Sequence, residues 1–102
     1  MMDRVMDEKE ILIHEFIYEQ LTEELDSAEE YHEHAEHAKH KGDHGLASLF
    51  MAHAKDEIRH FRALFEVIEK GVPNIKSNPL YPLLKDLEEW ACEMEEEFAK
   101  MR

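Results

Sequence analysis

The placement of glycine and proline constrains this chain more than any other feature. Its three glycines and three prolines fall in three short regions, near residues 42–45, 71–73 and 79–82. The stretches between these regions are rich in Glu, Ala, Leu, Lys and Met, which favour helix, and none shows the alternation of a strand. The sequence therefore predicts an all-α fold.

Local signals set the expected ends of the helices. Asp7 and Glu10 resemble a capping box, Gly42 suits a left-handed helix end, and Asn78 followed by Pro79 suits a helix start. A short turn between the first two helices favours an antiparallel hairpin, on which a C-terminal amphipathic helix could pack. We expect one domain over residues 1–102, with helices at 7–40, 44–70 and 79–100.

Charge and cysteine content narrow the classes of function. The chain carries 25 Asp and Glu against 12 Lys and Arg, a net charge of −13, which opposes binding to nucleic acid or to an anionic membrane. Cys92 is the only cysteine, so disulfide frameworks and Cys-rich metal sites within one chain are excluded. We expect a cytoplasmic protein. The eight histidines beside so many carboxylates indicate metal cations as partners.

The apolar seam of the expected hairpin is interrupted by ionisable residues. Steps of four and three along the first helix pass through Ile17, Leu21, Glu24, Ala28, Tyr31, Ala35 and Ala38. The same steps along the second helix pass through Leu46, Phe50, His53, Glu57, His60, Leu64 and Val67. Such positions normally hold Leu or Ile in a helical bundle. Two carboxylates and two imidazoles therefore occupy positions expected to be buried.

Glu57 and His60 form an ExxH motif, and residues three apart share one face of a helix. Glu24 lies 33 residues before Glu57, so the hairpin should bring it to a similar height. A buried carboxylate costs several kcal/mol unless it is paired or bound to a metal. These residues therefore form a candidate metal site, with ordinary solvated residues as the alternative. A second ExxH, Glu29 to His32, lies off the seam and is interpreted as surface.

These residues resemble a known family. Glu24, Tyr31 and the Glu57-x-x-His60 motif match the first-half signature of rubrerythrin-like proteins in the ferritin-like superfamily, and the similarity extends over residues 24–71. Full domains of that kind contain two such hairpins, whereas this chain has one. In this respect it is most similar to encapsulated ferritin-like proteins, which build a di-iron site across a two-fold interface between two short chains.

The resemblance implies a four-helix bundle completed by dimerisation, with two copies each of Glu24, Glu57 and His60 around two metal ions. Glu57 would bridge, Glu24 would be terminal, and one His60 would bind each metal. Iron is the implied metal, although Mn or Zn suits the same ligands. The implied activity is oxidation of Fe²⁺ by O₂ or peroxide in a homodimer or higher homo-oligomer. A peroxide-reducing rubrerythrin-like activity and a non-catalytic metal-binding oligomer are the alternatives.

Four further residues could support the site. Tyr31 is either a second-layer partner of the ligands or a core aromatic residue. His53, one turn before Glu57, is either an extra ligand or a hydrogen-bond donor to one. Glu23 and Asp26 flank the seam as a candidate uptake site for the cation.

Two other features complete the expectations. Five histidines crowd the end of the first helix, and we interpret them as a solvated face, with a surface Zn²⁺, Ni²⁺ or Cu²⁺ site as the alternative; they are His32, His34, His37, His40 and His44. Encapsulated relatives also carry a C-terminal targeting peptide, and the end of this chain, EEEFAKMR, has no obvious one. An encapsulin shell therefore stays an open alternative to free existence in the cytoplasm.

Overall fold

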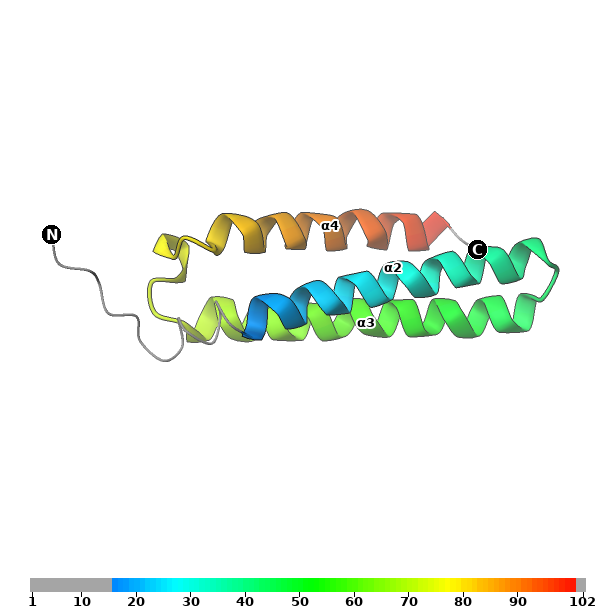
Figure 1. Cartoon of the computed structure of the whole chain (residues 1–102), viewed down its shortest axis with the longest axis horizontal. Coiled ribbons are helices and arrows are strands. Elements are labelled where there is room, and N and C mark those ends of the chain that lie inside the picture. The colour runs from blue at the N-terminus through cyan, green and yellow to red at the C-terminus, as the bar shows by residue number, and fades with distance from the viewer. Residues whose placement is uncertain (1–15, 101–102) are drawn as a thin grey trace, which may run out of the picture.

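The computed structural model describes residues 16–100 and is helical almost throughout (Figure 1). Its elements are α2 (Tyr18–His40), α3 (His44–Gly71), the short 3-10 helix η2 (Ile75–Ser77) and α4 (Tyr81–Lys100). The expected all-α hairpin with a third helix is confirmed, and the described residues contain no strand. The expected start of the first helix, with Asp7 and Glu10, lies outside the described residues.

The turn between α2 and α3 shows why the chain reverses here. Gly42 adopts a positive φ of 84°, which only glycine adopts without steric cost. The backbone N–H of Asp43 donates to the carbonyl of Ala38 at 2.9 Å, and the Asp43 carboxylate accepts from the backbone N–H of Leu46 at 3.0 Å. The same two residues therefore end one helix and cap the next.

The helix α4 begins later than the sequence predicts. The Asn78 carboxamide oxygen accepts from the backbone N–H of Leu80 at 2.8 Å, and the Asn78 carbonyl accepts from Tyr81 at 2.9 Å. Pro79 and Leu80 are held in this turn, so α4 begins at Tyr81 rather than at residue 79. Asn78 is nevertheless the residue that organises the helix start, as expected.

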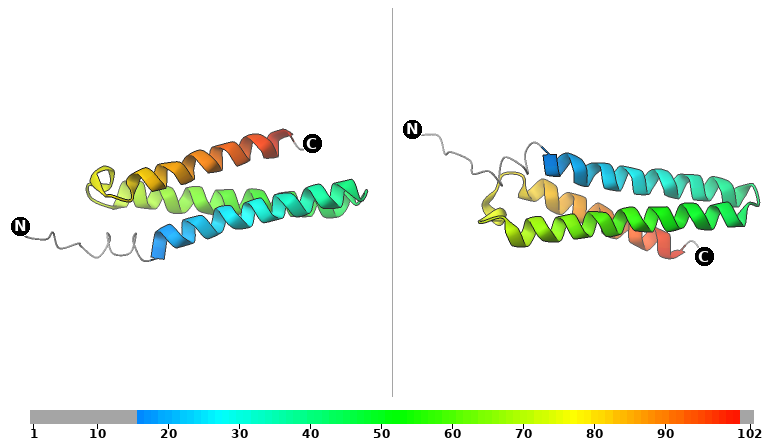
Figure 2. Two further views of the ribbon diagram at one scale, coloured as in Figure 1. Left: turned by 45° about the horizontal axis from the view of Figure 1, so that its top comes forward. Right: turned by 90° about the horizontal axis from the view of Figure 1, so that it is seen from below.

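The helix α4 lies along one side of the hairpin (Figure 2). It contributes one apolar stripe to a core shared by all three helices, and its buried residues are Leu84, Leu87, Ala91, Met94 and Phe98. Leu83, also on α4, is 44% exposed. No helix in the described range is long and apolar enough to cross a membrane.

The expected seam on α3 is wrong as a description of the chain's own core. The buried residues of α3 stand one position later, at Ala47, Met51, Ala54, Ile58, Phe61, Phe65 and Ile68. The reason is the position of α4. The stripe of α3 that begins at Ala47 faces the space between α2 and α4 and is therefore buried there. The stripe that contains Glu57 and His60 is left on the opposite side of the hairpin, where it is half-buried or exposed.

Candidate metal centre

The structure brings together Glu24, Glu57 and His60 on the side of the hairpin away from α4. His60 Nδ1 lies 3.5 Å from Glu24 Oε2 and 3.4 Å from Glu57 Oε1. One potential ligand atom from each residue falls within 4.8 Å of the other two. Within residues 16–100 this is the only group of three or more His, Cys, Asp or Glu side chains with such spacing.

Local helix geometry and the hairpin each supply part of this arrangement. Glu57 and His60 are one turn apart on α3, so their side chains project in the same direction. The antiparallel packing of α2 then sets Glu24 opposite them at the same height.

The site is buried unevenly. The Glu24 side chain is 13% exposed and that of Glu57 is 23% exposed, whereas the imidazole of His60 is 59% exposed. Glu24 Oε2 is buried and accepts no hydrogen bond. A buried carboxylate oxygen without a donor is unfavourable unless a cation approaches it.

The electrostatics of Glu24 and Glu57 also favour a bound cation. Burial raises the pKa of Glu57 above its ordinary value of 4.5, the nearby Glu24 carboxyl raises it further, and His60 partly opposes the shift. The two carboxyl groups therefore compete for one proton or one cation. Two carboxylates and an imidazole are ligands that suit Fe, Mn or Zn, so the residues present fit a divalent metal.

Tyr31 and His53 belong to a row of rings beside these residues. The row alternates between α2 and α3, and neighbouring ring centres lie 5.1 Å apart for Tyr31 and His53, 6.3 Å for Tyr31 and Phe50, and 5.4 Å for Phe50 and His34. In the described structure Tyr31 thus contacts His53 rather than a ligand of the candidate site. The expectation that either residue supports the site remains a proposal.

The remaining expected site residues lie apart from this group. Glu23 and Asp26 are exposed on α2, and the group of close ligand atoms contains neither. His32 pairs with Glu36 at 3.2 Å and its ring lies 5.1 Å from that of Phe98. The histidines near the turn form no group of three close ligand atoms in the described residues.

One residue at the site was missed by sequence reasoning. Gln20 Nε2 donates a hydrogen bond of 2.8 Å to Glu24 Oε1 from one turn earlier on α2. The signal was present, because residues four apart on a helix are neighbours and a Gln there can reach a Glu. It was overlooked because Gln is not a metal ligand of the expected type.

The metal group lies on a face of the hairpin that exposes apolar side chains. Val67 is 68% exposed, Leu49 is 53% exposed and Leu46 is 41% exposed, and all three lie on α3 outside its buried stripe. Phe50 and Leu64 on the same side are half-buried. We call this surface the open face, defined by Leu46, Leu49, Phe50, Glu57, His60, Leu64 and Val67 together with Glu24 and Tyr31.

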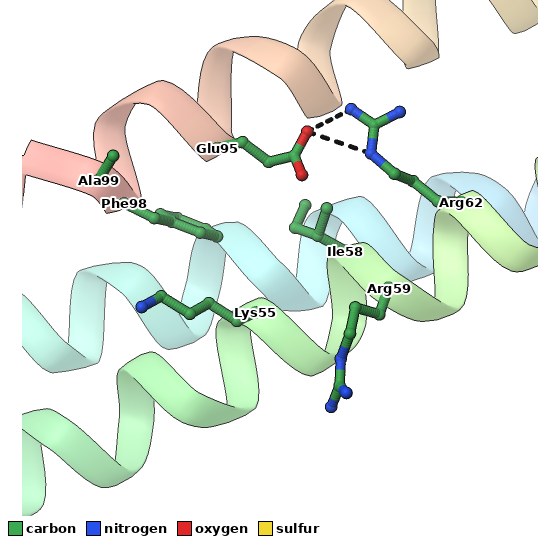
Figure 3. A pocket seen from close by; sticks show the side chains of 7 residues that line it. All are labelled: Lys55, Ile58, Arg59, Arg62, Glu95, Phe98 and Ala99. Carbon is green, nitrogen blue, oxygen red and sulfur yellow. Dashed lines mark hydrogen bonds and ion pairs between the residues drawn. The ribbon is translucent and has the colours of Figure 1, made fainter.

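A separate hollow of about 410 Å³ lies between α3 and α4 (Figure 3). There the Arg62 guanidinium donates to Glu95, with Nε at 3.1 Å, and to Cys92 Sγ at 3.3 Å. Glu95 and Cys92 raise the pKa of Arg62. Lys55 and Arg59 also line the hollow, but their charged ends do not converge on a common point (Figure 3). The contact therefore tethers α4 to α3 and provides no second site.

The fold and this site define a helical bundle protein with a carboxylate and histidine group suited to a metal ion. The family model described as a ferritin-like domain matches residues 15–102. The match spans most of the chain, which therefore belongs to the ferritin-like family. No curated protein and no solved structure matches it significantly.

Proposed function

We propose that two copies of this chain pair through their open faces, bind Fe²⁺ at the shared site and oxidise it with O₂ or peroxide. The observation that carries the proposal is the geometry of Glu24, Glu57 and His60. Their potential ligand atoms lie within 4.8 Å of one another, with an unsatisfied carboxylate oxygen, on a surface that residues 16–100 leave uncovered.

A second copy supplies what one chain lacks. A two-fold interface places the same surface of both copies in contact, so each half-site would face its equivalent. Two copies bring two each of Glu24, Glu57 and His60, which is the ligand set found in di-iron carboxylate bundles. Four carboxylates would balance the charge of two Fe²⁺ ions, and the exposed Val67, Leu49 and Leu46 would be removed from water.

Each residue has a defined task in this reaction. Glu24 and Glu57 present oxygen atoms, and His60 presents Nδ1, which must carry no proton when it binds a cation. Burial and the neighbouring Glu24 raise the pKa of Glu57, so a cation that binds there competes with a proton. Each bound Fe²⁺ gives one electron to the oxidant, while the protein supplies position and charge.

The surface charge supports delivery of the substrate. The net charge of −13 produces a negative potential around the molecule, which attracts divalent cations and raises their local concentration. This effect acts at long range, so it does not require a particular uptake residue such as Glu23 or Asp26. It should weaken as salt is added.

The test is Fe²⁺ oxidation by the Glu57→Ala variant, followed by absorbance under air. The matched control is Glu29→Ala, which removes the exposed glutamate of the other ExxH motif. We expect Glu57→Ala to lose the activity and Glu29→Ala to retain it. A Glu57→Ala protein that oxidises Fe²⁺ at the rate of the unaltered chain would sink the proposal.

The same assay separates the alternatives. Turnover with H₂O₂ but not with O₂ would favour a peroxide-reducing activity. A non-catalytic metal-binding oligomer would bind Fe²⁺ stoichiometrically under nitrogen. It would then show no oxidation of the bound Fe²⁺ when either O₂ or H₂O₂ is added. Light scattering with and without Fe²⁺ tests the pairing, since a monomer under both conditions contradicts the shared site.

A further inference from the structure

Gln20 makes the two oxygens of the Glu24 carboxylate unequal. Oε1 accepts the hydrogen bond from the Gln20 amide at 2.8 Å. A carboxylate can only accept, so the nitrogen of the amide must face it. Oε2 is buried, accepts no hydrogen bond and lies 3.5 Å from His60 Nδ1. One oxygen is therefore occupied, and the other is directed at the metal group.

We propose that Gln20 is a positioning residue that restricts Glu24 to ligation through the single oxygen Oε2. This inference rests on the proposed function, because it concerns the same site. The amide takes one lone pair of Oε1 and fixes the orientation of the carboxylate, which disfavours chelation of one cation by both oxygens and bridging of two cations. Gln20 thus selects a terminal role for Glu24.

Glu57 has no comparable restraint. Its Oε1 lies 3.4 Å from His60 Nδ1, and in the described structure the polar side chains that act on it are those of Glu24 and His60. No amide, hydroxyl or guanidinium group of residues 16–100 holds either oxygen. Among the described side chains Glu57 therefore interacts with the other two candidate ligands, Glu24 and His60, which suits a bridging ligand. The difference between the two glutamates comes from Gln20.

A Gln four residues before a Glu can also simply stabilise a helix. The two roles have different consequences. A helix-stabilising contact affects unfolding of the metal-free protein, whereas a positioning contact affects the affinity and geometry of the bound metal. Gln20 is exposed, so its replacement leaves the apolar core intact and allows both quantities to be measured.

The experiment compares Gln20→Met, which keeps the length of the side chain but removes the donor, with the unaltered chain and with Glu19→Gln as a neighbouring control. Co²⁺ is the probe, because its visible spectrum reports the number and geometry of its ligands. We expect Gln20→Met to bind Co²⁺ about 10-fold more weakly, as outer partners of metal ligands typically do, with a changed spectrum and an unchanged melting temperature without metal. Gln20→Lys retains a donor and should restore the original spectrum.

The outcomes separate the two levels of the proposal. If the unaltered chain binds Co²⁺ and Gln20→Met binds it with the same affinity and spectrum, the role of Gln20 is overturned. The proposed metal site is then still supported. A lowered melting temperature without metal and an unchanged spectrum would assign Gln20 a structural role and would also overturn it. If the unaltered chain binds no Co²⁺, the metal site itself fails and this inference fails with it.

Discussion

The two faces of α3 have opposite properties although they are one residue apart in register. The stripe from Ala47 to Ile68 is apolar and buried against α2 and α4. The stripe from Leu46 to Val67 is apolar only at its ends, carries Glu57 and His60 at its centre, and lies on the open face. One helix thus stabilises the fold on one side and presents ionisable groups on the other.

This difference indicates which side the chain can complete by itself. The buried stripe packs against residues of α2 and α4 in one core cluster of the described residues. On the open face, Glu24 keeps a buried oxygen without a donor and Val67 is 68% exposed. Features that are unfavourable for a lone chain are expected where function requires them.

The largest effect should come from the buried face. Phe61 is fully buried, and its ring centre lies 5.7 Å from that of Phe65. We expect Phe61→Ala to lower the free energy of unfolding by about 3–5 kcal/mol, because it leaves a cavity in the core. Val67→Ala, on the open face, should change it by no more than about 0.5 kcal/mol. Denaturant unfolding measures both, and similar losses would remove the distinction between the faces.

Metal binding should stabilise the open face. At a free concentration of 100 times its Kd, Fe²⁺ added under nitrogen should raise the free energy of unfolding by about 2.7 kcal/mol, since the unfolded chain lacks the site. Thermal unfolding followed by circular dichroism measures this gain, and a chelator should reverse it. Glu29→Ala should keep the gain and Glu57→Ala should lose it; equal stabilisation of both variants would place the metal elsewhere.

Association should depend on the open face alone. Val67→Glu introduces a charge into the proposed interface and should weaken self-association about tenfold, or ~1.4 kcal/mol, with little effect on the unfolding of the single chain. Ser48→Glu is the control, because Ser48 is exposed on the other side of α3. Sedimentation gives both dissociation constants. A stronger effect at Ser48 would place the interface on the side of α3 that carries Ser48 and would contradict an interface at the open face.

The smallest effect concerns pH. Because the pKa of Glu57 is raised above 4.5 in the folded chain, the folded state retains a proton that the unfolded state has lost as pH rises past 4.5. Stability of the metal-free protein should therefore fall with increasing pH between 4.5 and the raised pKa. Glu57→Gln should remove that decline. Parallel pH profiles for the two proteins would contradict the crowding of the carboxyl groups.

Much of the fold could be predicted because its signals are local. Gly42 and Asp43 mark the turn through backbone conformation and capping, which depend on a few adjacent residues. The ExxH spacing likewise places Glu57 and His60 on one face by helix geometry alone. The choice between the two stripes of α3 was predicted wrongly although the stripe from Ala47 to Ile68 is apolar throughout, because the stripe through Glu57 has the same bundle spacing and the packing of α4 decides which one is buried. Gln20 was missed for a related reason, since its importance depends on which oxygen of Glu24 faces His60.

By itself the sequence determined the helices, the turn between the first two, and the identity of the three residues that form the candidate site. These features follow from backbone propensity and from the 3.6-residue period, which act over one or two turns. Only the tertiary structure decided that the stripe from Ala47 to Ile68 is the core of α3, that Glu24 Oε2 lies 3.5 Å from His60 Nδ1, and that residues 16–100 leave the face with the site uncovered. Those results depend on how three helices share one apolar volume, which is a property of the packed chain.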